Sequence, residues 1–400
     1  MKRRDFLKFM LAGTAAGIFA SPAAAATPKR LIVIFQRGGC DGLNDDVPYG
    51  DDEYYNLRPT IAIPRPGNVG GALAMDNFFG LHPAMTSLHS LYEQGNVAVF
   101  PAVHYTGASR SHFDSQKYIE SAQISRHSDG WLNRHLSTQW NDLPMRGISF
   151  GNSVAHSLTG TVPVSSFNDL SQFKIDLDES SEERLINRLT EVYNESPEED
   201  VGYDPLIRQS GHTLFKDLQV SNLDVANYQP ESTVSYPNNS FGRQLANTAQ
   251  IIKEGAGVEL ATISHGGWDT HQNQGGAEGY QAKNLKSLSD GITAFYQDMG
   301  DRMADTIILT MTEFGRTAKE NGSLGTDHGH ASTWFALGGN VKKGIYGEWP
   351  GLQEHQLERG RYLAQATDFR DIFSEVIAQH LENNDQSIIP NYTANPIGFL

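Results

Sequence analysis

The apolar segment Leu31-Ile32-Val33-Ile34-Phe35 and the polar, glycine-rich segment after it, residues 37–44 (RGGCDGLN), decide the fold class of this chain. Five consecutive apolar residues predict a short strand that is buried on both faces, as strands of parallel sheets are. The polar segment then predicts a loop that begins at the carboxyl end of that strand.

Further strands and helices alternate along the rest of the chain. Apolar runs predict strands at residues 97–100, 258–263, 306–311 and 334–337. Apolar spacing of three and four predicts helices at residues 83–94, from 111, at 284–299 and at 368–380. This alternation predicts an α/β layer fold with a largely parallel central sheet.

Residues 165–239 differ from the rest because they are polar, helix-leaning and carry the acidic cluster Glu198-Glu199-Asp200. We interpret this stretch as a helical insertion or cap on one edge of the sheet. The alternative is that these helices belong to the same layers as the others. The chain shows no internal repeat or low-complexity run.

Composition excludes several classes of protein. The 400 residues contain 38% hydrophobic side chains, which is typical of a globular protein with one large domain or two ordinary ones. There are 31 Lys and Arg against 47 Asp and Glu, a formal net charge of -16, which disfavours nucleic-acid binding. The single cysteine excludes an intramolecular disulfide, a thiolate zinc site and a CxxC motif.

Residues 1–26 have the pattern of an export signal. Arg3-Arg4 starts it, an apolar run over residues 9–20 follows, and small residues up to Ala26 offer cleavage sites. The Arg pair is typical of a twin-arginine signal; the alternative is a Sec signal with a chance Arg pair. Twin-arginine export would suit a periplasmic protein that folds and loads a metal before crossing. No later stretch is apolar enough to span a membrane.

Five unusual segments are candidates for the functional site, and four of them begin just past a predicted strand. The fifth directly precedes one. In open α/β sheets ligands bind at the carboxyl ends of the strands, so we expect the five to converge on one edge. They are residues 37–44 (RGGCDGLN), 109–114 (SRSHFD), 266–271 (GGWDTH), 312–317 (TEFGRT) and 325–330 (GTDHGH).

These segments carry carboxylates and imidazoles in the combination that divalent metals prefer. Without thiolates, such a set suits one or two ions of Zn, Mn or Fe(II) better than Mg. A single His is more often structural, and one or two of the seven candidates would orient the true ligands. The candidate ligands are Asp41, Asp269, His271, Glu313, Asp327, His328 and His330.

Three further residues are candidates for catalysis. Ser111 is placed in the first turn of a predicted helix, where it could act as a nucleophile beside a metal or serve only as an N-cap. Arg110 and Arg316 could hold an anionic substrate group or form structural salt bridges. Cys40 has no evident His partner and is interpreted as a small buried residue.

Together, the Arg pair and the five segments resemble the bacterial family known as domain of unknown function 1501, from about Leu31 to His380. That family is similar to a branch of the alkaline phosphatase and sulfatase superfamily, which implies a three-layer α/β/α sandwich. In that pattern Asp41-Gly42 resembles the first metal ligand and Ser111 the nucleophile. Phe314 stands where the superfamily has a His ligand, so one of the two metal sites is incomplete or draws on Asp327 or His330. The formylglycine signature of sulfatases is absent.

We therefore expect an exported metal-dependent hydrolase of phosphate or sulfate esters, with Ser111 or a metal-bound water as nucleophile. Its substrate would be an anionic small molecule or glycan ester, and its oligomeric state is open. The alternative is a non-catalytic exported protein on a degenerate hydrolase fold that binds a glycan, an envelope component or a partner protein. A metal-dependent isomerase or transferase would use the same residues.

Overall fold

The structure is a computed structural model that describes residues 28–124, 129–139, 141, 143–170, 178–194, 204–220, 228–231 and 233–400. The predicted export signal at residues 1–26 and the acidic cluster at 198–200 lie outside the described residues. Within the described part, no helix is both long enough and apolar enough to cross a bilayer.

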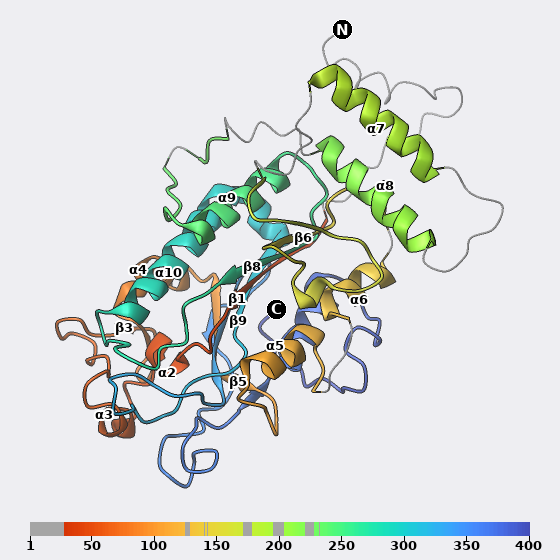
Figure 1. The fold of residues 1–400 in the computed structure, drawn as a ribbon. Helices are drawn as coiled ribbons and strands as arrows, with labels where there is room; N and C mark the ends of the chain where they lie inside the picture. The colour runs from red at the N-terminus through yellow and green to blue at the C-terminus, as the bar shows by residue number, and fades with distance from the viewer. Residues whose placement is uncertain are drawn as a thin grey trace.

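A nine-stranded sheet forms the centre of the molecule, in the order β11-β5-β10-β9-β1-β8-β6-β7, with β12 paired to β5 (Figure 1). The strands are β1 Arg30–Gln36, β5 Val97–His104, β6 Gly147–Phe150, β7 Ser165–Phe167, β8 Leu260–His265, β9 Thr306–Met311, β10 Ser332–Gly338, β11 Gly344–Ile345 and β12 Thr367–Asp368. A separate small sheet joins β2 Asp46–Val47, β4 Gly80–Leu81 and β3 Leu73–Ala74.

Most neighbouring strands of the large sheet run parallel. β1 pairs parallel with both β8 and β9, and β6 pairs parallel with β8 and β7. β10 instead runs antiparallel to both of its neighbours, β9 and β5. The prediction of an α/β fold with a largely parallel sheet is confirmed.

Helices cover both faces of this sheet. One face is covered by α4 Thr86–Glu93, α9 Ser240–Lys253 and α10 Tyr280–Met299, and the other by α5 His112–Ser121, α6 Trp131–Thr138 and α11 Phe369–Glu375. Short helices α2 Gly42–Asp45 and α3 Asp52–Leu57 lie in the long segment after β1. The result is the expected three-layer α/β/α arrangement.

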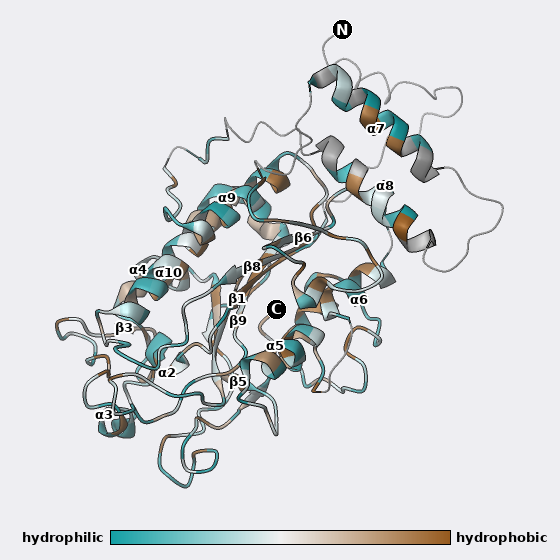
Figure 2. Cartoon of the chain, viewed as in Figure 1, coloured by the Kyte–Doolittle hydropathy of each residue, from teal (hydrophilic) through white to brown (hydrophobic). Residues whose placement is uncertain are grey.

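The core explains why β1 is a continuous apolar run. Ile32 and Ile34 belong to the cluster under α4, α9 and α10, whereas Leu31, Val33 and Phe35 belong to the cluster under α5, α6 and α11. Side chains alternate across a strand, so a strand covered on both faces must be apolar at every position. Figure 2 shows the apolar colour on the central strands and the polar colour on the outer helix faces.

The antiparallel direction of β10 places the fifth candidate segment. Residues 325–330 precede the amino end of β10, and in a fully parallel sheet that end would lie opposite to the carboxyl ends of β1, β8 and β9. Because β10 is reversed, its amino end lies at the same edge as those carboxyl ends. All five segments can therefore reach one edge of the sheet.

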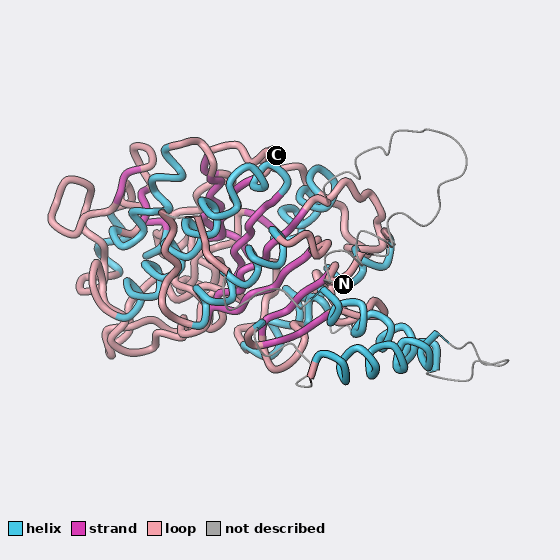
Figure 3. The backbone as a smooth tube through the Cα atoms, turned by 90° about the horizontal axis from the view of Figure 1, so that it is seen from above, coloured by secondary structure: helices cyan, strands magenta, loops and turns pink. Residues whose placement is uncertain are grey.

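The region at 165–239 contains both sheet and projecting helices. Residues 165–167 form β7, the edge strand of the central sheet, which was not predicted. Helices α7 Glu179–Asn194 and α8 Asp204–Val220 then pack side by side and extend beyond the sheet on one side of the molecule (Figure 3). The interpretation of this region as an insertion or cap stays a prediction.

Candidate metal centre

Three side chains from distant parts of the chain meet at the carboxyl edge of the sheet. His112 begins α5, Asp269 lies in the loop after β8, and His328 lies before β10. One ligand atom from each lies within 4.8 Å of the other two, the only such group of potential metal ligands among the described residues. His271, from the same loop as Asp269, joins them.

The distances between these atoms match those between ligands of one ion. From the oxygens of Asp269, the Nε2 atoms lie at 3.0 Å for His271, 3.3 Å for His328 and 3.6 Å for His112. The Nε2 atoms of His271 and His328 are 3.1 Å apart. Two ligands about 2.1 Å from a tetrahedral ion lie about 3.4 Å from each other. His112, Asp269 and His328 therefore already have the spacing of ligands of one ion, and Nε2 of His271 lies beside two of them.

Each imidazole is fixed by an acceptor at its other nitrogen. Nδ1 of His112 lies 2.7 Å from Glu313, Nδ1 of His271 lies 3.1 Å from Asp327, and Nδ1 of His328 lies 2.9 Å from the carbonyl oxygen of Arg110. Carboxylates and carbonyls only accept, so each Nδ1 must carry the hydrogen. In the neutral rings Nε2 then holds a lone pair, which is the arrangement of metal-bound His with a carboxylate or carbonyl behind it.

The arrangement of these lone pairs favours a bound divalent cation. Nε2 of His112 is buried and has no hydrogen-bond partner in the described part of the chain. Burial lowers the pKa of His328, which keeps that ring neutral. Three lone pairs and a carboxylate facing one point repel one another unless a positive charge lies between them. The side chains of Asp269, His271 and His328 are 46%, 40% and 27% exposed, so the centre is open to solvent.

Arg316 positions Asp269 and is not available to a substrate. Its side chain is fully buried and donates to Asp269 Oδ1 at 2.6 Å. It also donates to the carbonyl oxygens of Gly38, Gly39 and Trp268. Burial alone would raise the pKa of Asp269, but the hydrogen bond and charge of Arg316 lower it. Arg316 thus ties the segment after β1 to Asp269.

The backbone of the segment after β1 also lies very close to the loop that carries Asp269. Gly38 has φ +125°, and a Cβ at this position would lie 2.6 Å from the backbone nitrogen of Asp269. Its own N–H donates to Glu313 Oε1 at 2.9 Å. Only glycine fits here, since any side chain would push the loop that carries Asp269 away.

Glu313 acts on His112 from behind. Its carboxylate is fully buried and accepts from His112, Gly38 and Gln116. Burial would raise the pKa of Glu313, but the hydrogen bonds from His112 and Gln116 lower it. The hydrogen bond to Glu313 in turn raises the pKa of His112. Glu313 and Asp327 both lie behind imidazoles, where they can orient the rings.

His112 is the site residue that the sequence analysis missed. It lies within the segment 109–114 singled out there, one position after Ser111. A His in the first turn of a helix that follows a strand was the available signal. Its ring also packs against Phe314 and His328, with centroids 4.8 and 4.4 Å away.

Asp41 lies apart from the imidazoles. Both of its oxygens accept from the buried guanidinium of Arg58, at 2.6 and 2.8 Å, and one also accepts from Gln274 at 2.6 Å. Arg58 further donates to Asn44 and to two backbone carbonyls. The charge of this carboxylate is already offset by the buried Arg58, and we leave Asp41 out of the proposed ligand set.

His330 also points elsewhere. It packs edge-on against the fully buried His104, with ring centroids 4.5 Å apart. Burial lowers its pKa to about 4. Phe314, which replaces the expected His ligand, packs against His112 and His328 and forms an apolar wall of the centre.

Ser111 and Arg110 lie beside the centre with uncommitted side chains. Ser111 is the N-cap residue of α5, but its hydroxyl makes no capping hydrogen bond. The guanidinium of Arg110 stacks over Tyr362 at 4.7 Å. Among the described residues, neither Oγ of Ser111 nor the Arg110 guanidinium has a hydrogen-bond or ion-pair partner, so both can serve a ligand.

Solved structures with a similar fold belong to the alkaline phosphatase superfamily. An alkaline phosphatase superfamily protein from Vibrio parahaemolyticus is 9% identical, with a TM-score of 0.35 over 86% of this chain and 71% of that one. The alkaline phosphatase from the Antarctic bacterium TAB5 is 11% identical, with a TM-score of 0.33 over 90% and 99%. The sulfatase PsFucS1 from Pseudoalteromonas sp. is 11% identical, with a TM-score of 0.37 over 92% and 73%. These are distant likenesses of fold.

A family model gives a further match. The family described as protein of unknown function (DUF1501) matches residues 199–398, half of the chain. That half contains Asp269, His271, Glu313, Asp327 and His328. No curated protein sequence matches the chain.

Proposed function

The chain belongs to the DUF1501 family, and from its clustered imidazoles we propose that it is an exported, metal-dependent hydrolase of phosphate or sulfate esters. The observation that carries this proposal is the convergence of three oriented Nε2 atoms on Asp269. A divalent cation bound there would polarise an ester oxygen and make an adjacent hydroxyl or water more acidic. Zn, Mn or Fe(II) suits the nitrogen-rich ligand set.

The groups around the centre support an anionic substrate. Arg110 is held in place by Tyr362 and, within the residues that the structure describes, has no carboxylate partner. A cavity of about 240 Å³ adjoins the centre at Asp327 and is lined by Lys319 and Arg361. The same cavity is also lined by the acids Glu320 and Asp327, so Arg110 is the cation best placed to meet an anionic group. Arg110 would offset part of the charge of a phosphoryl or sulfuryl group during transfer.

Ser111 is the proposed nucleophile. It follows a strand and a loop, and its hydroxyl stands at the amino end of α5, where the helix dipole favours developing negative charge. His112, the next residue, faces the centre with Nε2. If Ser111 does not attack, a water in the same place would.

Export is part of the proposal and rests on the first 26 residues of the sequence. Their twin-arginine pattern suits a protein that acquires its metal before it crosses the membrane. The site of action would then be the periplasm.

Turnover of aryl esters tests the function. Protein loaded with Zn, Mn or Fe(II) would be assayed on p-nitrophenyl phosphate and p-nitrophenyl sulfate, beside His328→Ala and the control His355→Ala. His355 is an exposed loop residue. We expect metal-dependent turnover that His328→Ala abolishes and His355→Ala retains. A metal-loaded, folded protein that turns over neither ester would favour the non-catalytic binding protein instead.

A further inference from the structure

Arg37, directly after β1, takes no part in the proposed metal centre, yet two strands and a helix hold its guanidinium. Nε donates to Ser264 Oγ of β8 at 3.0 Å, and the two Nη atoms donate to Glu120 of α5 at 3.0 and 3.3 Å. The guanidinium also lies 4.2 Å from the ring centroid of Phe35. Nη1 further donates to Gln116 Oε1 at 3.1 Å. This last contact leads from the ion pair toward the centre.

Gln116 connects Arg37 to the acid behind His112. Its Nε2 donates to Glu313 Oε1 at 2.9 Å, and the same oxygen accepts from Nδ1 of His112 at 2.7 Å. Gln116 and His112 are four residues apart on α5, so both lie on one face of this helix. Arg37, Gln116, Glu313 and His112 therefore form one continuous series of hydrogen bonds, which we call the Arg37 network.

The direction of each hydrogen bond in the Arg37 network is fixed by its charged members. A guanidinium can only donate, and a carboxylate can only accept. The carbonyl oxygen of Gln116 must therefore face Arg37, and its NH2 group must face Glu313. Turning this amide over would bring the oxygens of Gln116 and Glu313 together and break the contact with Arg37. Glu313 thus stays an acceptor for His112, whose Nε2 keeps its lone pair.

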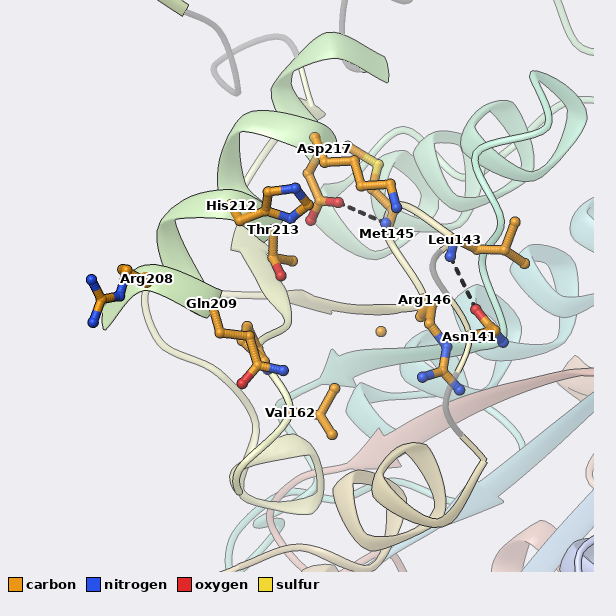
Figure 4. Close-up of a pocket in the computed structure, with 13 residues that line it drawn as sticks. Asn141, Leu143, Met145, Arg146, Val162, Arg208, Gln209, His212, Thr213 and Asp217 are labelled. Carbon is orange, nitrogen blue, oxygen red and sulfur yellow. Dashed lines mark hydrogen bonds between the residues drawn. The ribbon is translucent and has the colours of Figure 1, made fainter. Parts of the chain in front are cut away.

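A second arginine, at the opposite edge of the sheet, shows the contacts of a structural role. Arg146 lies in the wall of a cavity of about 340 Å³ between α8 and the segment that leads into β6 (Figure 4). It too forms a two-point ion pair, with Glu259 at 3.0 and 2.8 Å, and it donates to the carbonyl oxygens of Leu136 and Gln139. Those contacts end on the backbone, whereas the contacts of Arg37 continue through an amide side chain toward a candidate metal ligand.

We propose that Arg37 and Gln116 are positioning residues of the metal centre, which hold the Glu313 carboxylate where it orients His112. The inference rests on the proposed metal centre and adds two residues that do not contact the metal ligands themselves. Glu313 Oε1 accepts three hydrogen bonds, the third from the N–H of Gly38 at 2.9 Å. Without Gln116 this oxygen would be held less firmly, and the ring of His112 would move with it. A ring that turns away, or that carries its hydrogen on Nε2, cannot bind the metal through Nε2.

The Zn affinity of the full protein, measured by competition with a chelator, tests the proposal. Gln116→Met keeps the length of the side chain and removes both of its hydrogen bonds in the Arg37 network. Loss of the group that directly orients a metal-bound His weakens metal binding by about 10- to 100-fold. Glu313 keeps two of its three donors on Oε1 in this variant, so we expect a smaller loss, of about three- to tenfold.

Ser264→Ala is the matched control, because it removes a different hydrogen bond of Arg37 that does not lead to Glu313. We expect this variant to change the Zn affinity less than about twofold. Thermal unfolding of the Zn-free proteins would establish that both variants are folded. A purely structural role of Gln116 predicts instead a less stable Gln116→Met protein with unchanged Zn affinity.

The ring nitrogens of His112 give a second readout that needs neither metal nor activity. Nitrogen NMR of the Zn-free protein distinguishes a hydrogen on Nδ1 from one on Nε2. We expect it on Nδ1 in the wild type and in Ser264→Ala, and a detectable share on Nε2 in Gln116→Met. Unchanged Zn affinity in Gln116→Met, an equal loss in Ser264→Ala, or identical ring signals in all three proteins would overturn the proposal and leave the metal centre in place. Wild-type protein that binds no Zn would overturn the metal centre and this proposal with it.

Discussion

Replacing Glu313 by Gln is expected to weaken metal binding by about 10- to 100-fold without unfolding the protein. Glu313 touches no proposed substrate position and reaches the centre through Nδ1 of His112, 2.7 Å away, while it also accepts from Gly38 and Gln116. The variant therefore distinguishes two roles of this carboxylate. It either strengthens His112 as a metal ligand or serves only the stability of the fold.

The magnitude follows from the contacts of this carboxylate. The hydrogen bond from His112 is charge-assisted, and such bonds are worth about 1.5 to 3 kcal/mol, roughly twice a neutral one. An amide oxygen can still accept from His112, Gly38 and Gln116, so about half of that energy is lost. A loss of about 1.4 kcal/mol is a tenfold weaker affinity. If the amide instead turns its NH2 group toward Nδ1, His112 must change tautomer and the loss approaches 100-fold.

The assay is a competition titration of Zn against a chelator of known affinity. Glu375→Gln is the control, because Glu375 also accepts three hydrogen bonds, from the backbone N–H groups of Ile397, Gly398 and Leu400, but lies far along the chain from the centre. Circular dichroism would confirm that both variants are folded. Unchanged Zn affinity in Glu313→Gln, or the same loss in Glu375→Gln, would refute the reasoning.

Three further outcomes follow from single side chains. Arg58→Met leaves the buried carboxylate of Asp41 without its cation, so we expect a loss of about 3 to 5 kcal/mol and a Tm lower by about 4 to 6 °C, with metal content unchanged; metal loss in the folded variant would restore Asp41 as a ligand. Burial lowers the pKa of His82 to about 4, and its Nδ1 accepts from the N–H of Ala84, so the folded protein excludes a proton that the unfolded chain binds. The associated stability is complete above about pH 6.5 and falls by about 3 kcal/mol toward pH 4; urea unfolding should show a shallower fall for His82→Gln, and an equal fall would assign the acid sensitivity elsewhere. Ser111→Ala should reduce aryl ester turnover more than about 100-fold at full metal occupancy, and retention of most of the activity would assign the attack to water.

The sequence was enough to predict the layers of the fold. A run such as Leu31–Phe35 is apolar at every position only because helices cover both faces, and that condition can be read directly from the residues. β6 was not predicted. Its four residues, Gly147-Ile148-Ser149-Phe150, alternate small and apolar side chains, and so short a pattern is only a weak signal of a strand. The reversal of β10 depends on how the sheet is assembled and leaves no mark in its apolar run.

The sequence predicted which segments form the candidate site, but not which residue in each segment takes which role. All five segments meet, and Asp269, His271 and His328 meet within them. Which acid binds an ion and which holds an imidazole depends on distances between residues such as His112 and Glu313, 201 positions apart in the chain. Arg58 pairs with Asp41, 17 positions earlier in the chain, and no helix or strand spacing predicts that pair. Such pairings arise from the tertiary fold alone.

The metal content of the folded protein tests the central claim most directly. Wild type, Asp269→Ala and the control His355→Ala would each be incubated with Zn, Mn or Fe(II), desalted and measured by elemental analysis. We predict about one equivalent of metal in the wild type and in His355→Ala, and loss of that metal in Asp269→Ala. Folded wild-type protein that retains none of these ions would contradict the account.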